Sequence, residues 1–406
     1  MNDASSDKGL EIQKLIAAQS PGYSLDQRFY TDPEVYGLEL ERIIYRNWII
    51  AGHQSELSNT GDFKVFKVAG ESAIIVRGQD GELNAFANVC RHRGSIVCLE
   101  ASGNARKFSC PYHGWTYDTD GKLVAARNMP EDFDWDSHAL KSVSCDVVHG
   151  LILICFCDDP PSLSNCRKEL AEPMAMFDFE NLKVAAHKEY PIPANWKMSV
   201  ENYQECYHCA TAHPDYARMH TLMLDAKKRE RVQQHMLEKL DACGLKEILV
   251  DHIDTAARRG EIGYGYSRTA LFEGYLTGSR DGKPIAPLLG ELKDYDGGAS
   301  DMTFGPVSFL LAYSDHVVCY VFTPVDQHNS KCEIYWLVRG NAEEGKDYDV
   351  DELTWLWDVT TEADKTIIVN NYKGVRSRYY EPGPFSGMER PERVYVEWLL
   401  QELARE

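Results

Sequence analysis

The spacing of apolar residues near the N-terminus predicts a short helical arm. Tyr36, Leu40 and Ile43 recur at the intervals of a helix. An aspartate followed by a proline, at positions 32 and 33, is a typical start signal for that helix. We therefore expect residues 1–43 to form a helical arm that packs on the C-terminal part of the chain.

An alternating pattern then predicts a small antiparallel β domain. From Asp62 onward, apolar and polar residues alternate as they do in half-buried strands. Asp-Gly pairs at 80–81 and 120–121 are typical of the turns between such strands. An apolar run at 150–157 closes the pattern, and the aspartates and prolines that follow it mark a boundary. This domain is predicted over residues 44–160.

The remainder, residues 161–406, has the mixed periodicity of an α+β domain. Helices are predicted at 195–213, 351–372 and 389–404, and strands of an antiparallel meander at 309–313, 316–324 and 332–339. Between 221 and 259, charged residues with interspersed apolar ones indicate a solvated helical excursion. The chain as a whole is expected to be α+β.

Composition and charge narrow the class of protein. The chain has 406 residues, 44% hydrophobic and 26% charged, as in a globular protein of two or three domains. No apolar run could span a bilayer and no signal-peptide pattern begins the chain, so we expect a cytoplasmic protein without a membrane segment. The net charge of −20 argues against nucleic acid as a partner. Most of the 12 cysteines should be buried thiols, because a reducing compartment disfavours disulfides.

Two short loops each carry one cysteine and one histidine. Cys90 and His92 belong to the first loop, and Cys110 and His113 to the second. Zinc also accepts two thiolates and two imidazoles, but its loops usually repeat one ligand type. The mixed loops instead suit a binuclear iron cluster in which one iron takes both thiolates and the other takes both imidazoles. This is the ligation of a Rieske [2Fe-2S] cluster.

A second candidate metal site follows at His208 and His213. On a regular helix these side chains would point about 140° apart. Pro214 biases His213 away from helical geometry, so that it can turn back toward His208. Glu205 has the spacing that places it on the same helical face as His208. Two imidazoles need one carboxylate to complete the facial triad that holds a single Fe(II) with positions open for dioxygen and substrate.

These motifs resemble those of the Rieske non-haem iron oxygenases. The strings CRHRG at 90–94 and CPYHGW at 110–115 are similar to the Rieske domain of ring-hydroxylating and N-demethylating oxygenases. Residues 195–214 are similar to the mononuclear iron motif of the same family. The resemblance implies that the C-terminal domain is a helix-grip catalytic domain, an antiparallel sheet with flanking helices.

The resemblance also implies the third iron ligand. In this family the carboxylate comes from a late C-terminal helix that ends near a Gln-x-Gly string, and here Asp364 precedes Gly374 at the matching interval. Tyr372 stands where glutamine is common, so the register of this helix is open and Glu362 and Asp358 remain alternative ligands.

Partners follow from the same resemblance. The chain has no GxGxxG dinucleotide loop, so electrons from NAD(P)H would arrive through a separate flavin and iron–sulfur reductase. Family members are commonly trimers in which the cluster of one subunit supplies the mononuclear iron of its neighbour. Glu205 would then link the two centres by hydrogen bonds, and Asn202 is a candidate catalytic residue of the same motif. Dioxygen and a small-molecule substrate complete the expected reactants.

Two stretches resemble one branch of the family. Aromatic-ring dioxygenases typically have Asp at the position of Glu205, whereas Glu resembles the branch that acts on carnitine, choline, glycine betaine and stachydrine. Residues 268–290 are similar to the glycine betaine and stachydrine demethylases. This branch implies hydroxylation of an N-methyl group of a small quaternary ammonium compound, with release of formaldehyde. An aromatic-ring hydroxylating dioxygenase and a Rieske electron carrier without the second iron remain alternatives.

A cationic substrate would need aromatic faces around it, and the sequence does not select among the candidates. These are Tyr203, Tyr207, Tyr264, Tyr266, Phe272, Tyr275, Phe304 and Phe309. Arg268 is a candidate partner for a substrate carboxylate. Cys206 and Cys209 flank His208, and we expect both to be packing residues.

Overall fold

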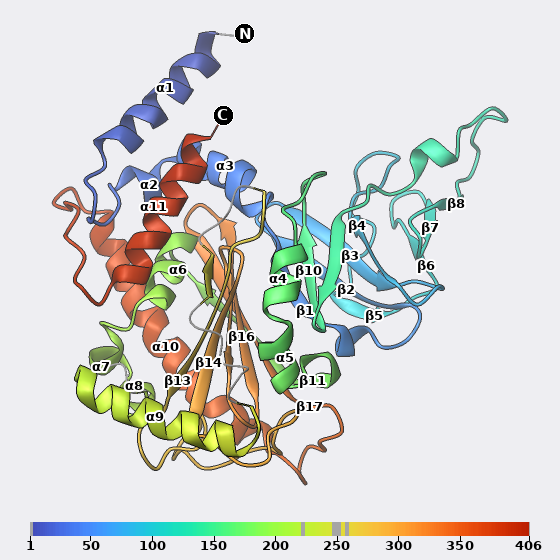
Figure 1. The fold of residues 1–406 in the computed structure, drawn as a ribbon. Coiled ribbons are helices and arrows are strands. Elements are labelled where there is room, and N and C mark those ends of the chain that lie inside the picture. Colours follow the sequence, from blue (N-terminus) through green and yellow to red (C-terminus); the bar gives the residue numbers. More distant parts are fainter. Residues whose placement is uncertain (1–2, 221–223, 246–252, 256–259, 406) are drawn as a thin grey trace.

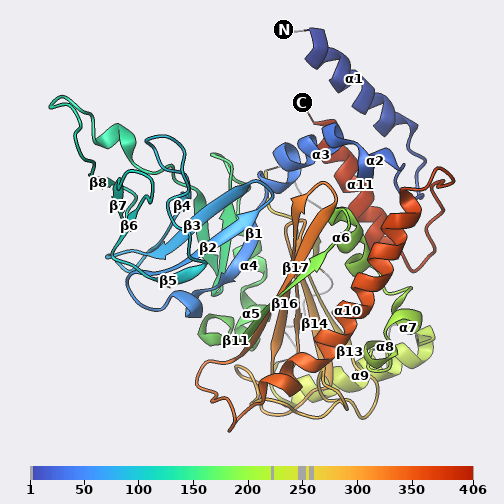
Figure 2. The ribbon, with the colours of Figure 1, turned by 180° about the vertical axis from the view of Figure 1, so that it is seen from behind.

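The chain folds into two lobes of unequal size (Figure 1). The computed structural model describes residues 3–220, 224–245, 253–255 and 260–405. The smaller lobe consists of short strands and long loops, whereas the larger lobe has one central sheet with helices beside it, as Figure 2 shows from behind. The expected α+β class with antiparallel sheets is confirmed. The domain boundaries after residues 43 and 160 remain predictions.

The N-terminal segment lies against the larger lobe. It contains α1 (Asp3–Ala18), α2 (Arg28–Thr31), α3 (Pro33–Glu39) and the π-helix η1 (Leu40–Ile44). The Asp32 carboxylate accepts a hydrogen bond from the Glu34 amide at 2.8 Å and caps α3, as the start signal predicts. Arg42 donates to the Leu403 carbonyl at 2.5 Å and fastens the segment to α11 (Arg390–Ala404). α1 lies in the helical arm predicted over residues 1–43, although the spacing that predicts this arm begins only at Tyr36.

A buried ion pair joins this segment to helix α6 (Trp196–Gln204). Nζ of Lys197 lies 2.7 Å from Oε1 of Glu39, and both side chains are 0% exposed. The indole N–H of Trp196 also donates to Glu39, at 2.9 Å. Burial raises the pKa of Glu39 and lowers the pKa of Lys197. Each group therefore depends on the other to compensate the cost of its burial.

Three antiparallel sheets make up the smaller lobe. The first sheet has the strand order β1 (Ile49–His53), β10 (Leu151–Cys155) and β9 (Ser144–Val148). The second has the order β4 (Leu83–Ala87), β3 (Glu71–Arg77), β2 (Asp62–Val68) and β5 (Ser102–Asn104). The third has the order β6 (Lys107–Ser109), β7 (Thr116–Asp118) and β8 (Leu123–Ala125). The predicted strands of this region are confirmed at β2, β3 and β10. β1 lies just after the predicted helical arm, inside the predicted β domain, and pairs with β10.

One seven-stranded antiparallel sheet forms the centre of the larger lobe. Its strands are, in order, β11 (Leu182–Ile192), β17 (Asn329–Arg339), β16 (Val317–Asp326), β15 (Ser308–Ala312), β14 (Gly298–Phe304), β13 (Tyr264–Ala270) and β12 (Ile253–Thr255). The predicted meander is confirmed as β15, β16 and β17. The sequence pattern missed β11, β13 and β14.

Helices cover this sheet, and α10 (Val350–Val375) runs along it in Figure 2. The others are α4 (Ser164–Glu169), α5 (Ala171–Met176), α6, α7 (Cys209–Ala212), α8 (Pro214–Ala217), α9 (Ala226–Ala242) and α11. The helices predicted at 351–372 and 389–404 are confirmed as α10 and α11. α9 lies in the predicted excursion, of which residues 221–223, 246–252 and 256–259 are outside the described residues. Over the described ranges, no helix combines the length and apolarity needed to cross a bilayer.

Candidate metal centres and substrate cavity

Two loops in the smaller lobe share one backbone geometry. In the first, the Cys90 amide donates to the Ser95 carbonyl at 2.8 Å, and the Gly94 amide donates to the Cys90 carbonyl at 3.0 Å. The corresponding bonds from Cys110 and Gly114 in the second loop are 2.7 Å and 3.0 Å. Both glycines have positive φ, 78° and 74°, which glycine adopts without steric cost. The sequence thus builds two matching loops.

The four predicted cluster ligands lie in these loops. Cys90 and Cys110 are 4% and 2% exposed, whereas His92 and His113 are on the surface. The two Nδ1 atoms lie 3.0 Å apart, close enough for one iron to bond to both. The loops thus present two thiols inside the lobe and two imidazoles at its surface. This donor set fits a Rieske cluster whose histidine edge faces outward.

Two aromatic residues beside these ligands were not singled out in the sequence. The Tyr117 hydroxyl lies 3.3 Å from Sγ of Cys90 and accepts a hydrogen bond from the Arg91 amide at 3.0 Å. The Trp115 ring stacks on His92, with centroids 4.9 Å apart. Hydrogen bonds to the sulfur ligands are one of the factors that set the potential of such clusters. Trp115 belongs to the second motif in the sequence, but no sequence signal marks Tyr117.

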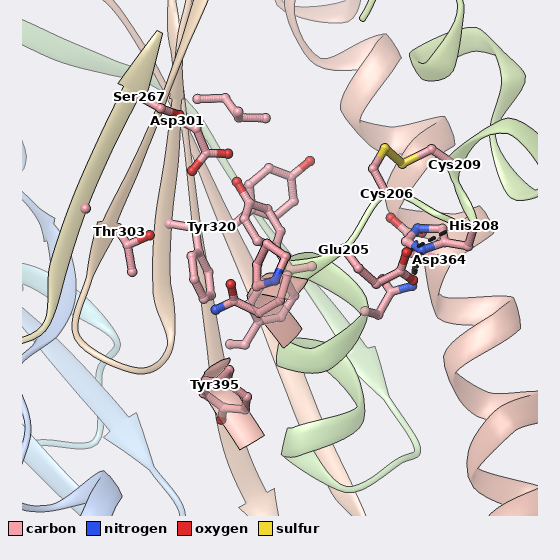
Figure 3. Close-up of a pocket in the computed structure, with 18 of the residues that line it drawn as sticks. Glu205, Cys206, His208, Cys209, Ser267, Asp301, Thr303, Tyr320, Asp364 and Tyr395 are labelled. Carbon is pink, nitrogen blue, oxygen red and sulfur yellow. Dashed lines mark hydrogen bonds and ion pairs between the residues drawn. A yellow bond between two sulfur atoms is a disulfide. The ribbon is translucent and has the colours of Figure 1, made fainter. Parts of the chain in front are cut away.

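His208, His213 and Asp364 converge in the larger lobe. The Nε2 atoms of the two histidines lie 3.1 Å apart. Oδ1 of Asp364 lies 3.2 Å from Nε2 of His208 and 3.0 Å from Nε2 of His213. His208 and His213 flank α7, and Asp364 projects from α10 toward His208 in Figure 3.

The spacing of these three atoms suits a metal ion. Ligand bonds of about 2.1 Å at right angles separate the ligand atoms by about 3.0 Å, as on one face of an octahedron. Oδ1 of Asp364 is buried and makes no hydrogen bond of normal geometry, although both imidazoles are near. It is thus placed to bind a shared ion rather than either histidine. The set fits a site of two histidines and one carboxylate for Fe(II).

The electrostatics of the site also favour a cation. Burial would lower the pKa of His208, but the carboxylates of Asp364 and Glu205 outweigh it and raise that pKa to about 9. Burial would raise the pKa of Asp364, but the two nearby histidines hold it below its usual value. The Asp364 carboxylate thus stays ionised, and its negative charge attracts a cation to the site.

Glu205 and Asn202 both lie beside His208. Oε1 of Glu205 is 2.5 Å from Nδ1 of His208, and the other carboxylate oxygen accepts from the backbone amides of Tyr207 and His208. Nδ2 of Asn202 lies 3.4 Å from Nε2 of His208. The Glu205 carboxylate therefore fixes the orientation of the imidazole and leaves Nε2 directed at Asp364.

The backbone reaches this geometry by a route that differs from the prediction. The continuous helix expected over 195–213 is wrong, because α6 ends at Gln204 and Glu205 is extended, with φ −129° and ψ 157°. A turn, not a helical face, brings Glu205 to His208. Pro214 starts α8, and His213 lies outside helical geometry, with φ −142°, as its proline neighbour predicts.

The two alternative ligands lie elsewhere on α10. Oδ2 of Asp358 is 2.6 Å from Nζ of Lys188, and Tyr190 donates to the other oxygen. Glu362 is exposed and lies 3.5 Å from Nζ of Lys365. Of the three acids considered for the third ligand, the structure brings only Asp364 to the histidines.

Cys206 and Cys209 are joined by a disulfide, so the expectation that they only pack is wrong. Their Cα atoms lie 5.0 Å apart across the turn, within the range that a disulfide can bridge. The bond closes the C-x-x-C segment around His208, as Figure 3 shows. It is the one disulfide that the described part of the chain contains, and the other ten cysteines are free thiols.

A cavity of about 790 Å³ lies next to His208, His213 and Asp364. This size is typical of pockets for small molecules. Aromatic side chains form much of its wall: Tyr203, Tyr216, Tyr264, Tyr266, Phe309, Tyr320, Phe322, Trp357, Tyr395 and Trp398. Four of the sequence candidates are among them, and Tyr207, Phe272, Tyr275 and Phe304 are not. Tyr320 and Phe322 lie on β16, Tyr216 on α8 and Trp357 on α10, and no local sequence pattern marks these four residues as neighbours of one cavity.

Arg268 cannot serve a substrate carboxylate. Its guanidinium donates to Asp296 at 2.6–2.9 Å and to Ser300 at 2.8 Å, and its side chain is 0% exposed. The residue does not line the cavity. The sequence suggestion is therefore wrong, because the fold uses this charge to pair a buried aspartate.

A cluster-binding lobe joined to a lobe with two histidines and an aspartate beside a cavity is the arrangement of the Rieske non-haem iron oxygenases. Comparison with known families agrees. The Rieske [2Fe-2S] domain matches residues 47–144, and the ring hydroxylating alpha subunit (catalytic domain) matches residues 179–405. The chain belongs to the ring-hydroxylating alpha-subunit family. It is an oxidoreductase subunit whose domains imply a Rieske cluster, a mononuclear iron, O2 as co-substrate and a reductase partner.

Individual relatives were found by sequence and by structure. The glycine betaine monooxygenase oxygenase subunit of Chromohalobacter salexigens is 33% identical over 92% of this chain and 84% of the relative. The carnitine monooxygenase oxygenase subunit of Acinetobacter pittii is 40% identical over 50% of this chain and 56% of the relative. A solved quaternary ammonium Rieske monooxygenase superposes with a TM-score of 0.73 at 25% identity, over 96% of this chain and 98% of that one.

Proposed function

We propose that this chain is the oxygenase component of a monooxygenase that hydroxylates an N-methyl group of a small quaternary ammonium compound of the betaine type. The observation that carries the proposal is the aromatic-lined cavity beside His208, His213 and Asp364. Aromatic faces attract ammonium cations by roughly 0.5–2 kcal/mol each. The relatives named for glycine betaine and carnitine support the same substrate class.

We assign the metal ligands on the distances above. Cys90, Cys110, His92 and His113 hold the Rieske cluster, and His208, His213 and Asp364 hold the mononuclear iron. The iron supplies the activation of dioxygen. The protein positions the methyl group next to it, and the aromatic wall excludes water from the bound cation.

The atoms of the reaction balance with dioxygen and an external reductant. One oxygen atom enters a C–H bond of the methyl group, and the other leaves as water with two protons and two electrons. The N–CH₂OH bond then breaks, the nitrogen keeps the electron pair, and the hydroxyl loses its proton as formaldehyde departs. The electrons come from NAD(P)H through a flavin and iron–sulfur reductase. We further propose a homotrimer, in which Glu205 connects one subunit's cluster to the next subunit's iron. A solved relative described with inter-subunit electron transfer supports this arrangement.

A substrate panel tests the function. Purified oxygenase, a compatible reductase, NADH and O2 are supplied with betaines, carnitine, choline and simple arenes. We expect formaldehyde and the demethylated amine in equal amounts from at least one ammonium compound, with matching O2 uptake. A cis-diol from an arene, together with no turnover of any ammonium compound, would establish the ring dioxygenase instead.

Replacing Glu205 by Gln tests the proposed electron path. The amide cannot accept as strongly from His208, so we expect both metal centres to remain while reoxidation of the reduced cluster by substrate and O2 slows by about 10–100-fold. Stopped-flow absorbance of the cluster measures this rate. Glu362→Gln, an exposed acid on α10, is the matched control and should behave as the wild type. Unchanged turnover in Glu205→Gln would remove Glu205 from the path.

A further inference from the structure

The sheet side of the cavity carries a single charged group. Side chains of alternate residues on β13 to β16 face the cavity, and they include Ser267, Thr303, Leu311 and Tyr320. Among the described residues on this face, Asp301 on β14 is the one that bears a charge. Figure 3 shows its carboxylate across the cavity from His208 and Asp364.

Asp301 lacks a partner within the protein. In the described part of the chain its carboxylate makes no hydrogen bond and no ion pair, and its cross-strand neighbours are Ser267 and Leu311. Burial alone raises the pKa of Asp301 to about 7. A desolvated carboxylate without a partner is costly, so folded proteins normally pair such groups.

Asp296, in the loop that leads into β14, is an acid with a structural role and serves as a comparison. Asp296 is buried, whereas Asp301 is partly exposed, and Asp296 receives three hydrogen bonds from Arg268 and a fourth from Ser314 at 2.9 Å. These contacts hold the pKa of Asp296 below its usual value against the effect of burial. Asp301 has no such contacts, and its oxygens remain open to the cavity.

Among the residues that the structure describes, no base pairs with Asp301. The basic residues that line the cavity are Arg229, Lys365 and Arg390, and each is at least partly exposed to solvent. None of them contributes to the pKa of Asp301, which burial alone determines. The described residues thus leave this carboxylate free to pair with a cation bound in the cavity.

Tyr203 and Tyr216 line the same cavity as Asp301. Burial and then the charge of Asp301 raise the pKa of Tyr203 and of Tyr216, and Asp364 adds to the effect on Tyr216. Tyr216 thus lies within electrostatic reach of both carboxylates. A ligand that fills this cavity would meet Asp301 on one side and His208 and Asp364 on the other, as Figure 3 shows.

We propose that Asp301 binds the positively charged nitrogen of the substrate and so selects onium compounds over neutral isosteres of the same shape. This inference rests on the proposed function and adds a specificity-determining residue to it. The aromatic wall accepts either kind of ligand by its apolar character, whereas the carboxylate distinguishes a charged nitrogen from a neutral carbon. The bound cation also compensates the cost of burying Asp301.

A matched pair of ligands isolates this role. Choline and 3,3-dimethylbutan-1-ol have the same shape, but the second has carbon in place of the charged nitrogen. We measure binding of both to the oxidised holoenzyme by calorimetry, without reductase, so that no turnover occurs. The wild type should prefer choline by about tenfold or more, and Asp301→Asn should lose most of that preference while binding the neutral alcohol as before. Thr303→Val, on the same face of β14, is the control and should keep the preference.

Wild-type protein gives a second readout that does not depend on folding of the variant. Tyr203 on α6 and Tyr216 on α8 line the same cavity and have raised pKa values, and burial lowers the pKa of His220 to about 4, so none of these titrates near pH 7. Choline should therefore bind more weakly as the pH falls below about 7, with release of a proton visible in buffers of different ionisation enthalpy.

The outcomes separate this inference from the proposed function. A wild type without preference for choline, or an Asp301→Asn variant that keeps it, overturns the role of Asp301. Formaldehyde production with unchanged KM in that variant would overturn it while the demethylase function stands. Conversely, the protein could prefer choline in a way that depends on Asp301 and still demethylate no ammonium compound. That result would support the cation site at Asp301 and overturn the proposed demethylase function.

Discussion

Replacing Asp364 by alanine should leave a brown protein that forms no product. The cluster lies in the other lobe, so its visible absorption should persist, while the iron content falls from about three to about two per chain. Loss of a direct ligand should reduce product formation by more than the roughly 10–100-fold typical of residues that only support ligands. Metal analysis together with the product assay tests this prediction.

Two neighbours on the same helix serve as controls for Asp364→Ala. Glu362 is exposed, and Asp358 is bound to Lys188, so Glu362→Ala and Asp358→Asn should each keep the full iron content. If either of these variants lost the mononuclear iron while Asp364→Ala retained it, the register assigned to α10 at the metal site would be wrong.

Replacing Cys110 by serine should abolish the visible spectrum and all turnover that depends on the reductase. The hydroxyl is a poor substitute for the thiolate in a cluster that has only two of them. The mononuclear iron should remain, because its ligands come from α10 and the segment around α7. Cys98→Ser, a buried thiol of the same lobe, is the control and should stay brown. A colourless wild-type protein with stoichiometric zinc would exclude the cluster altogether.

Local sequence signals were sufficient to predict those features that are formed by residues close together in the chain. The loops at Cys90 and Cys110 carry their ligands and their glycines within a few residues, so the local order of residues indicates the cluster site. Asp32 caps α3 through its own neighbours, and Pro214 determines the backbone of His213. Each of these features depends on contacts between residues close together in the chain.

Features that depend on distant contacts were not predictable in this way. β1 pairs with β10, which is distant in the sequence, and the alternating pattern that predicts strands begins only at Asp62. Asp301 cannot be recognised as a cavity residue until β14 is placed between β13 and β15, and that strand has no clear signal in the sequence. Asp364 was selected among three acids by resemblance, and only the fold shows that Asp358 is bound to Lys188.

The ion pair between Glu39 and Lys197 has a consequence for protein engineering. The larger lobe is discontinuous in sequence, since one half of its buried pair comes before the smaller lobe and the other half after it. A chimera that transplants residues 161–406 from this chain onto another N-terminal half would bury an ammonium group without its carboxylate. Such a loss typically costs about 3–5 kcal/mol, enough to unfold many domains. Recombination between homologues should therefore exchange the middle segment and leave the two ends of the chain together.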